Sequence, residues 1–135
     1  MSGFVLDATA LVEVLRQVPS RRFVRRLSSV PTGDRWTTSV VVGELMHAGR
    51  RAAEASVMTD VLRLVAAVRV APFDVAAART YGKLAATLEW AGASLSPTDL
   101  MTVAITRTLD MTLVTRRPHL FGRIPQLRVE DWTVD

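Results

Sequence analysis

The sequence contains no cysteine and only two histidines, His47 and His119. Without cysteine, the chain cannot form a disulfide framework, a thiolate zinc site or a cysteine nucleophile. Long apolar runs are missing too, because the longest stretch without a charged residue, 90–98, is about half as long as a membrane-spanning helix. No basic region precedes the short apolar run 1–6, as a secretion signal would require. We therefore expect a cytoplasmic protein with no membrane segment.

The composition that remains is typical of one globular domain. The chain has 135 residues, of which 49% are hydrophobic and 22% charged, with only 7 glycines and 6 prolines. This balance favours a packed core over a disordered chain. We expect one domain that spans residues 1–135.

Positive charge is carried almost entirely by arginine. Lysine and arginine together number 17 against 13 acidic residues, which gives a net charge of +4, and Lys83 is the only lysine. Arginine offers a planar fork of donors that fits phosphate and carboxylate groups. Clusters at 21–26, 50–51 and 116–117 are compatible with an anionic partner such as RNA or an acidic protein. The cluster at 21–26 can also be the solvent-exposed face of a helix, because the apolar residues Phe23, Val24 and Leu27 recur at helical spacing and turn to the other side.

Short apolar runs alternate with segments of helical periodicity. This alternation predicts an α/β fold with a mainly parallel sheet of about five strands and helices on both faces. Ligands bind such sheets at the carboxyl ends of the strands. The predicted strands cover 4–6, 36–38, 68–71, 111–115 and 127–130. The predicted helices cover the segment from Asp7 to about Val18, then 20–29, 40–53, a segment around 58–65, 75–90 and 97–109, with Ser20, Ser39 and Ser96 as N-caps and Gly92 closing the fifth.

Three carboxylates occupy unusual positions in this pattern. Asp7 ends an apolar strand, Glu44 shares an apolar helix stripe, and Asp99 opens a helix of apolar residues. Carboxylates are rarely buried alone, and three of them at one sheet edge suit a hard divalent cation such as Mg²⁺ or Mn²⁺. Each acid also has a structural interpretation. Asp7 can cap a helix, Asp99 can interact with a helix dipole, and Glu44 can reach solvent at the edge of its stripe.

Four parts of the chain resemble, in order, the PIN-domain ribonucleases, specifically the VapC-type toxins of bacterial toxin-antitoxin pairs. Residues 5–11 (VLDATAL) resemble the first strand and helix of that family, and residues 38–45 (TSVVVGEL) resemble its second strand and acidic helix. Residues 96–104 (SPTDLMTVA) resemble its third acidic segment. Residues 113–116 (LVTR) and 121–125 (FGRIP), followed by VEDW at 129–132, resemble its closing part. The resemblance covers nearly the whole chain.

The resemblance implies a PIN-domain fold and a Mg²⁺- or Mn²⁺-dependent endoribonuclease that hydrolyses structured RNA such as tRNA or rRNA. Asp7, Glu44 and Asp99 would form its acidic cluster. Asp7 and Asp99 would hold the metal, with Glu44 as a third ligand. The Thr115 hydroxyl would position water or phosphate, and Thr9 would assist. The family also implies a homodimer and a cognate VapB-type antitoxin that inhibits the cleft.

The sequence departs from the family at a fourth acidic position. Two residues after the threonine of the fourth strand, the family usually carries Asn or Asp, and here Arg117 stands in that place; Leu120 replaces a further acid. A site with one carboxylate fewer should bind its metal more weakly. Arg116 and Arg117 can compensate by binding RNA phosphate, since arginine pairs with phosphate through two hydrogen bonds, or they can be part of a solvated turn. The alternative function is a PIN-fold module that binds RNA or protein with weak or lost nuclease activity.

Overall fold

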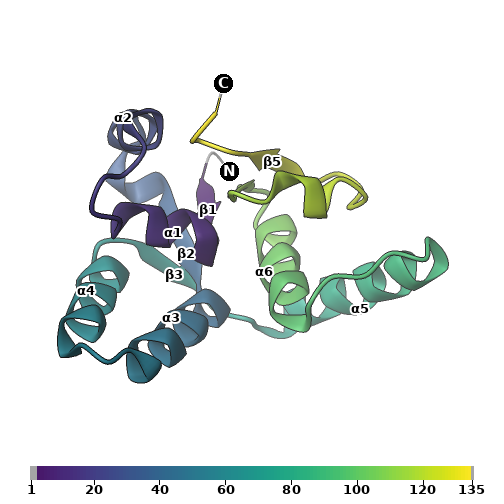
Figure 1. Ribbon diagram of the computed structural model, residues 1–135. Coiled ribbons are helices and arrows are strands. Elements are labelled where there is room, and N and C mark those ends of the chain that lie inside the picture. Colours follow the sequence, from purple (N-terminus) through teal and green to yellow (C-terminus); the bar gives the residue numbers. More distant parts are fainter. Residues whose placement is uncertain (1–2, 135) are drawn as a thin grey trace.

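The computed structural model describes residues 3–134, and its central feature is a fully parallel sheet (Figure 1). The five strands lie in the order β3-β2-β1-β4-β5. The predicted α/β fold with a parallel central sheet is therefore confirmed. The strands are β1 (Phe4–Leu6), β2 (Arg35–Thr38), β3 (Arg69–Ala71), β4 (Thr112–Val114) and β5 (Arg128–Glu130).

The order of the strands fixes where a ligand site can form. The chain places β2 and β3 on one side of β1, and then returns to place β4 and β5 on the other side. The direction of winding thus reverses between β1 and β4, and the crevice at the carboxyl ends of two such strands is where open parallel sheets bind ligands. Asp7 directly follows β1 and Thr115 directly follows β4.

Helices cover both faces of the sheet, because neighbouring residues of a strand point to opposite faces. On β1, Leu6 packs into one core together with side chains of the first four helices, and Val5 packs into a second core with side chains of the last two. Figure 1 shows these two groups of helices on either side of the sheet. The helices are α1 (Ala8–Val14), α2 (Arg21–Ser29), α3 (Ser39–Arg51), α4 (Ala55–Ala66), α5 (Val75–Trp90) and α6 (Pro97–Thr108), with short 3₁₀ turns at η1 (Thr32–Asp34) and η2 (Pro118–Phe121).

Side-chain caps start five helices, α1, α2, α3, α5 and α6, at the ends of the strands and loops that precede them. Asp7, Ser20, Asp74 and Ser96 each accept a hydrogen bond from a backbone N–H in the first turn of the next helix. The prediction of Ser20 and Ser96 as N-caps is confirmed. The prediction of Ser39 is wrong, because Thr38 caps α3 and Ser39 is its first residue. The helix therefore begins as soon as β2 ends.

Two further differences concern helix ends and exposure. The first helix ends at Val14 and not at Val18. Val18 directly precedes Pro19, which disfavours a helical conformation there, and its side chain is 81% exposed. Gly92 does close α5, with a positive φ of 67° that suits glycine. At the end of the same helix the side chain of Trp90 is 93% exposed.

The arginine-rich helix α2 has the predicted solvated face. Its four arginines are exposed, and Phe23 is fully buried. Val24 is 43% exposed, so the buried side of α2 is narrower than its sequence indicates. Arg26 stacks over the rings of Phe4 and Trp132. Within residues 3–134, no helix has the length and apolarity to cross a membrane.

Candidate active site

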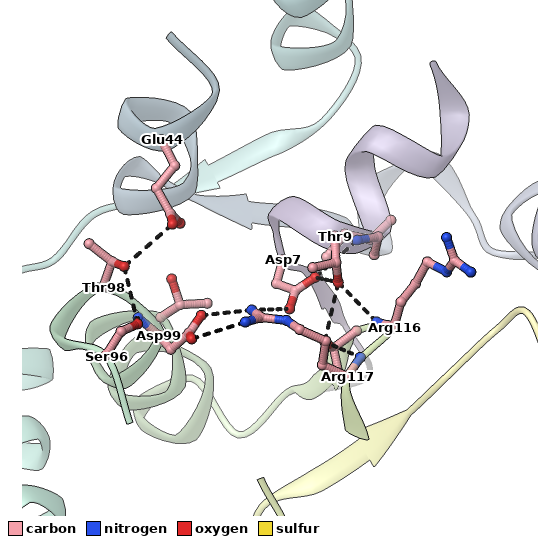
Figure 2. Close-up of polar contacts among 12 residues, drawn as sticks. Asp7, Thr9, Glu44, Ser96, Thr98, Asp99, Arg116 and Arg117 are labelled. Atoms are coloured by element: carbon pink, nitrogen blue, oxygen red, sulfur yellow. Dashed lines mark hydrogen bonds and ion pairs between the residues drawn. The ribbon is translucent and has the colours of Figure 1, made fainter. Parts of the chain in front are cut away.

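The carboxyl edge of the sheet brings most of the predicted site residues together (Figure 2). Asp7 comes from the end of β1, Asp99 from the first turn of α6, and Arg117 from the turn after β4. Glu44 faces Asp99 from α3, and Thr98 lies between them (Figure 2). These elements are far apart in the sequence and meet because β1 pairs with both β2 and β4.

Asp7 is the most buried acid of the group, at 3% exposure. Its Oδ1 accepts hydrogen bonds from the Ala10 N–H at 3.0 Å and from the Thr9 hydroxyl at 2.6 Å. Its Oδ2 is buried and has no hydrogen-bond partner among the described residues. One oxygen therefore caps α1, as the structural interpretation predicts, and the other remains available for a cation or a ligand.

Two threonine hydroxyls connect Asp7 to the turn after β4. The hydroxyls of Thr9 and Thr115 lie 3.3 Å apart, and since Thr9 gives its hydrogen to Asp7, Thr115 is the donor between them. Thr9 Oγ1 also accepts from the Arg116 N–H at 2.9 Å, and Thr115 Oγ1 accepts from the Arg117 N–H at 3.0 Å. Thr115 is fully buried. The two hydroxyls thus fix the position of Asp7 relative to the arginine-bearing turn.

Arg117 places its guanidinium between Asp7 and Asp99 (Figure 2). Its Nη2 donates to Asp99 Oδ1 at 3.0 Å and its Nη1 donates to Asp99 Oδ2 at 3.4 Å. The same Nη2 lies 3.7 Å from the free Oδ2 of Asp7. Burial lowers the pKa of Arg117, but the hydrogen bond to Asp99 and the charges of Asp99, Asp7 and Glu44 outweigh it and raise the pKa above its ordinary value. The guanidinium therefore stays charged.

Glu44 completes the group on the far side of Asp99. Its Oε2 accepts a hydrogen bond from the Thr98 hydroxyl at 3.3 Å. Partial burial, followed by the negative charges of Asp99 and Asp7, raises the pKa of Glu44 above 4.5, although the Thr98 hydrogen bond and Arg117 act in the opposite direction. Burial and the acidic neighbours of Glu44 therefore outweigh the stabilisation that Thr98 and Arg117 give its charge.

Arg116 points away from the two aspartates (Figure 2). Its Nη1 lies 3.8 Å from Oε1 of Glu13, a glutamate on α1 with no exposed surface. Arg16 Nη1 contacts both oxygens of Glu13, at 3.0 and 3.1 Å. Sequence reasoning missed Glu13, because its only signal is an acid three residues before an arginine, which is the usual pattern of an exposed helix pair.

The donors of this site suit a hard divalent cation in their chemistry. Such ions prefer carboxylate oxygens, and the buried Oδ2 of Asp7 lacks any partner in the part of the chain that the structure describes. As the side chains lie, however, no three acidic or histidine side chains within residues 3–134 are gathered as a metal site. The guanidinium of Arg117 occupies the space between the two aspartates instead.

The remaining candidates lie outside the acidic group. His47 and His119 are both exposed. A surface cavity of about 760 Å³ lies between α2 and the last described residues, lined among others by Arg22, Arg26 and Trp132. None of the three acids lines this cavity. We therefore place the candidate active site at the carboxylates and not in this cavity, although the cavity is large.

A parallel α/β fold with an acidic group at its switch point defines a class of proteins that bind ligands at the carboxyl edge of the sheet. The chain itself belongs to the PIN domain family, whose family model matches residues 4–124. The resemblance of the sequence segments to this family is therefore confirmed.

Individual relatives match over nearly their whole length. The chain is 27% identical over 134 residues to a protein from Shigella flexneri named tRNA(fMet)-specific endonuclease VapC, covering 98% of this chain and 100% of the relative. A protein of the same name from Salmonella typhimurium is 25% identical and covers 98% of this chain and 99% of its own.

Solved structures show the same fold. A DNA-bound VapBC from Salmonella typhimurium superposes with a TM-score of 0.89 at 25% identity, covering 98% of this chain and 99% of the other. A VapBC-1 structure from nontypeable Haemophilus influenzae gives a TM-score of 0.87 at 23% identity, with 97% and 98% covered.

Proposed function

We propose that this protein is an endoribonuclease of the VapC type, the toxin of a toxin-antitoxin pair. The observation that carries the proposal is the convergence of Asp7, Glu44 and Asp99 at the carboxyl edge of a PIN-domain sheet. Relatives of full length bear the name of a tRNA endonuclease. We extend this activity to structured RNA, tRNA or rRNA, as the substrate of this chain.

The proposed cofactor is Mg²⁺, with Mn²⁺ able to replace it. Asp7 and Asp99 would hold the ion, and Glu44 would be its third ligand through water. When bound, the ion supplies electrostatic stabilisation at the phosphate and a more acidic water. The unpartnered Oδ2 of Asp7 supports this assignment, because it is a buried carboxylate oxygen that no hydrogen-bond donor among the described residues satisfies.

The threonines act as positioning residues in this proposal. Thr9 fixes the carboxylate of Asp7 through a hydrogen bond of 2.6 Å. Thr115 is buried, and its hydroxyl donates to Thr9 and accepts from the Arg117 N–H. These contacts support a role in orienting the turn more than direct contact with phosphate. Arg116 has an exposed guanidinium, and we assign it to an RNA phosphate at the mouth of the site.

The partner we propose is a VapB-type antitoxin. The two solved structures compared above are both VapBC assemblies. We further propose that the toxin is a homodimer and that it meets its RNA and its antitoxin in the cytoplasm.

A second function is favoured by the position of Arg117. Its guanidinium already neutralises part of the acidic group, so a PIN module that binds RNA or protein without cleaving RNA is the alternative. The two functions differ in one measurable property, which is metal-dependent cleavage.

The test is RNA cleavage by the purified protein, free of any partner. Total cellular RNA is incubated with the protein in Mg²⁺ or Mn²⁺, beside an EDTA control, and new RNA ends are mapped. We compare Asp7→Asn with Asp60→Asn, since Asp60 is an exposed aspartate on α4. We expect discrete cuts that disappear with EDTA and fall roughly 100-fold or more in Asp7→Asn, because the site loses its most buried anionic donor, whereas Asp60→Asn stays at the wild-type level.

Intact RNA in every metal would contradict the nuclease and favour the binding module. Cleavage that persists in Asp7→Asn would show that the acidic group is not the active site.

A further inference from the structure

Arg117 has the features of a built contact and not of a surface side chain that happens to lie nearby. Its backbone N–H is held by Thr115 Oγ1 at 3.0 Å, and Pro118 directly after it begins the 3₁₀ turn η2. Both terminal nitrogens engage Asp99, and the second one also approaches Asp7. The side chain leaves the protein backbone at a fixed point and ends between two carboxylates.

The atoms that Arg117 engages are those that a cation would need. It binds both oxygens of Asp99 and lies 3.7 Å from the one oxygen of Asp7 that has no hydrogen bond in the described structure. The remaining oxygen of Asp7 already receives two hydrogen bonds as the cap of α1. A divalent cation bound to the free Asp7 oxygen and to Asp99 would therefore use the same oxygens as the guanidinium.

Charge makes joint occupation unfavourable as well. A guanidinium and a divalent cation repel each other, and at a separation of a few ångströms this repulsion is substantial even at the effective dielectric of a protein surface. With Arg117 in place, the acidic group already has one of its charges compensated. With Arg117 removed, no other side chain labelled in Figure 2 would place a positive charge between Asp7 and Asp99, because Arg116 points away from them.

We infer that Arg117 is a built-in competitor of the divalent cation: its guanidinium and the ion take the same oxygens of Asp7 and Asp99, so the ion binds only when Arg117 leaves. The inference rests on the proposed cation site. It assigns Arg117 a role in regulating metal occupancy, and it makes the wild-type site weaker for metal than the same site without the arginine.

The test is direct Mn²⁺ binding, followed by the electron paramagnetic resonance signal of free Mn²⁺ and without RNA. We compare the wild type with Arg117→Gln, and with Arg63→Gln as the control, since Arg63 is an exposed arginine on α4. We expect Arg117→Gln to bind Mn²⁺ on the order of tenfold more tightly or better, because a nearby positive charge is removed. Arg63→Gln should match the wild type.

A double variant tests whether the ion binds at Asp7. In Arg117→Gln combined with Asp7→Asn, the gain in Mn²⁺ affinity should disappear, because the free oxygen of Asp7 no longer carries charge. Thermal melting gives an independent readout. Mn²⁺ should raise the melting temperature of Arg117→Gln more than that of the wild type, because a ligand stabilises the state that binds it. If Arg117→Gln does not fold, Arg117→Lys replaces it, since lysine cannot bridge two carboxylates with a planar fork; its Mn²⁺ affinity should lie above that of the wild type.

Equal Mn²⁺ affinity of the wild type and Arg117→Gln would overturn the inference, and so would the absence of Mn²⁺ binding in every folded variant. The proposed nuclease fails in a different experiment. RNA cleavage by the wild type with no gain of Mn²⁺ affinity in Arg117→Gln would refute the competition and leave the nuclease. A gain in affinity with no cleavage by any variant would leave the competition and refute the nuclease.

Discussion

Single residues decide how charge is balanced at the carboxyl edge of the sheet. Glu44 accepts a hydrogen bond from the Thr98 hydroxyl and faces Asp99 (Figure 2). Burial and the two aspartates disfavour its ionised form more than Thr98 and Arg117 favour it, so the pKa of Glu44 is raised. Because its pKa is higher in the folded than in the unfolded protein, the folded state holds the Glu44 proton to higher pH.

This shift predicts the pH dependence of Glu44→Gln. As pH rises from the ordinary pKa of 4.5 through the raised folded value, ionisation of Glu44 costs the wild type stability that the variant keeps. We expect Glu44→Gln to gain less than about 1 kcal/mol over the wild type at pH 7, since the group is partly exposed and solvent screens it. At pH 3 the two proteins should differ less than at pH 7.

Urea unfolding at both pH values measures the difference. Glu89→Gln serves as the control, because Glu89 is an exposed glutamate on α5 away from the acidic group. A stability difference of Glu44→Gln that is the same at pH 3 and pH 7 would refute the shift.

At the scale of elements, the residue that ends a strand also starts the next helix. Thr38 is the last residue of β2, is fully buried and caps α3 by accepting from the Val41 N–H at 3.1 Å. The same hydroxyl shares a hydrogen bond of 3.1 Å with Thr102 on α6. Ser39 is exposed, and its hydroxyl accepts a bond of 3.3 Å from the Phe73 N–H. Thr38 thus joins β2, α3 and α6.

Substitution at these two neighbours separates their roles. We expect Thr38→Val, which keeps the shape of the side chain, to cost about 1–2 kcal/mol, because the Val41 N–H loses its acceptor and Thr102 loses its partner. Ser39→Ala should cost less than about 1 kcal/mol, because an exposed N–H can bind water instead. Equilibrium unfolding of both variants in urea gives the two values, and the reverse order would mean that Ser39 is the cap.

At the scale of the whole molecule, the net charge is +4, and arginine carries nearly all of the positive charge. The four arginines of α2 are exposed, and Arg116 is exposed at the mouth of the acidic site. Positive side chains that contact RNA phosphates release bound counterions, so binding weakens as salt increases.

Salt therefore provides a test of RNA binding independent of cleavage. With labelled tRNA in EDTA, which prevents metal-dependent cleavage, we expect the logarithm of the association constant to fall linearly with the logarithm of the KCl concentration. Arg116→Gln should reduce the magnitude of that slope by about 1 if Arg116 contacts a phosphate. Arg63→Gln, at an exposed arginine of α4, serves as the control and should leave it unchanged. A slope near zero for the wild type would argue against RNA as its ligand.

The sequence by itself determined the order of elements and the positions of the acids. Apolar periodicity and cap residues are local signals, and they predicted α5 over 75–90 and the cap of α6 at Ser96, as the structure has them. Because parallel strands share one carboxyl edge, finding Asp7 and Thr115 at strand ends was enough to predict the same edge of the sheet for both. In the structure Thr9 connects them, since its hydroxyl donates to Asp7 and lies 3.3 Å from the hydroxyl of Thr115. Thr38 and Ser39 are neighbours, and both residue types are common caps, so local signals do not show which of them caps the helix. The cap is decided by the burial of Thr38 against α6, where it shares a hydrogen bond with Thr102.

Only the tertiary structure decided where the long side chains end. An arginine has several rotatable bonds, so its position in the chain leaves the direction of its guanidinium open. Arg116 and Arg117 are neighbours, yet one reaches the buried Glu13 and the other lies between Asp7 and Asp99. The direction of each guanidinium depends on carboxylates from α1, α6 and the end of β1. These carboxylates are distant in the sequence, so the residues of the turn alone do not predict the two directions.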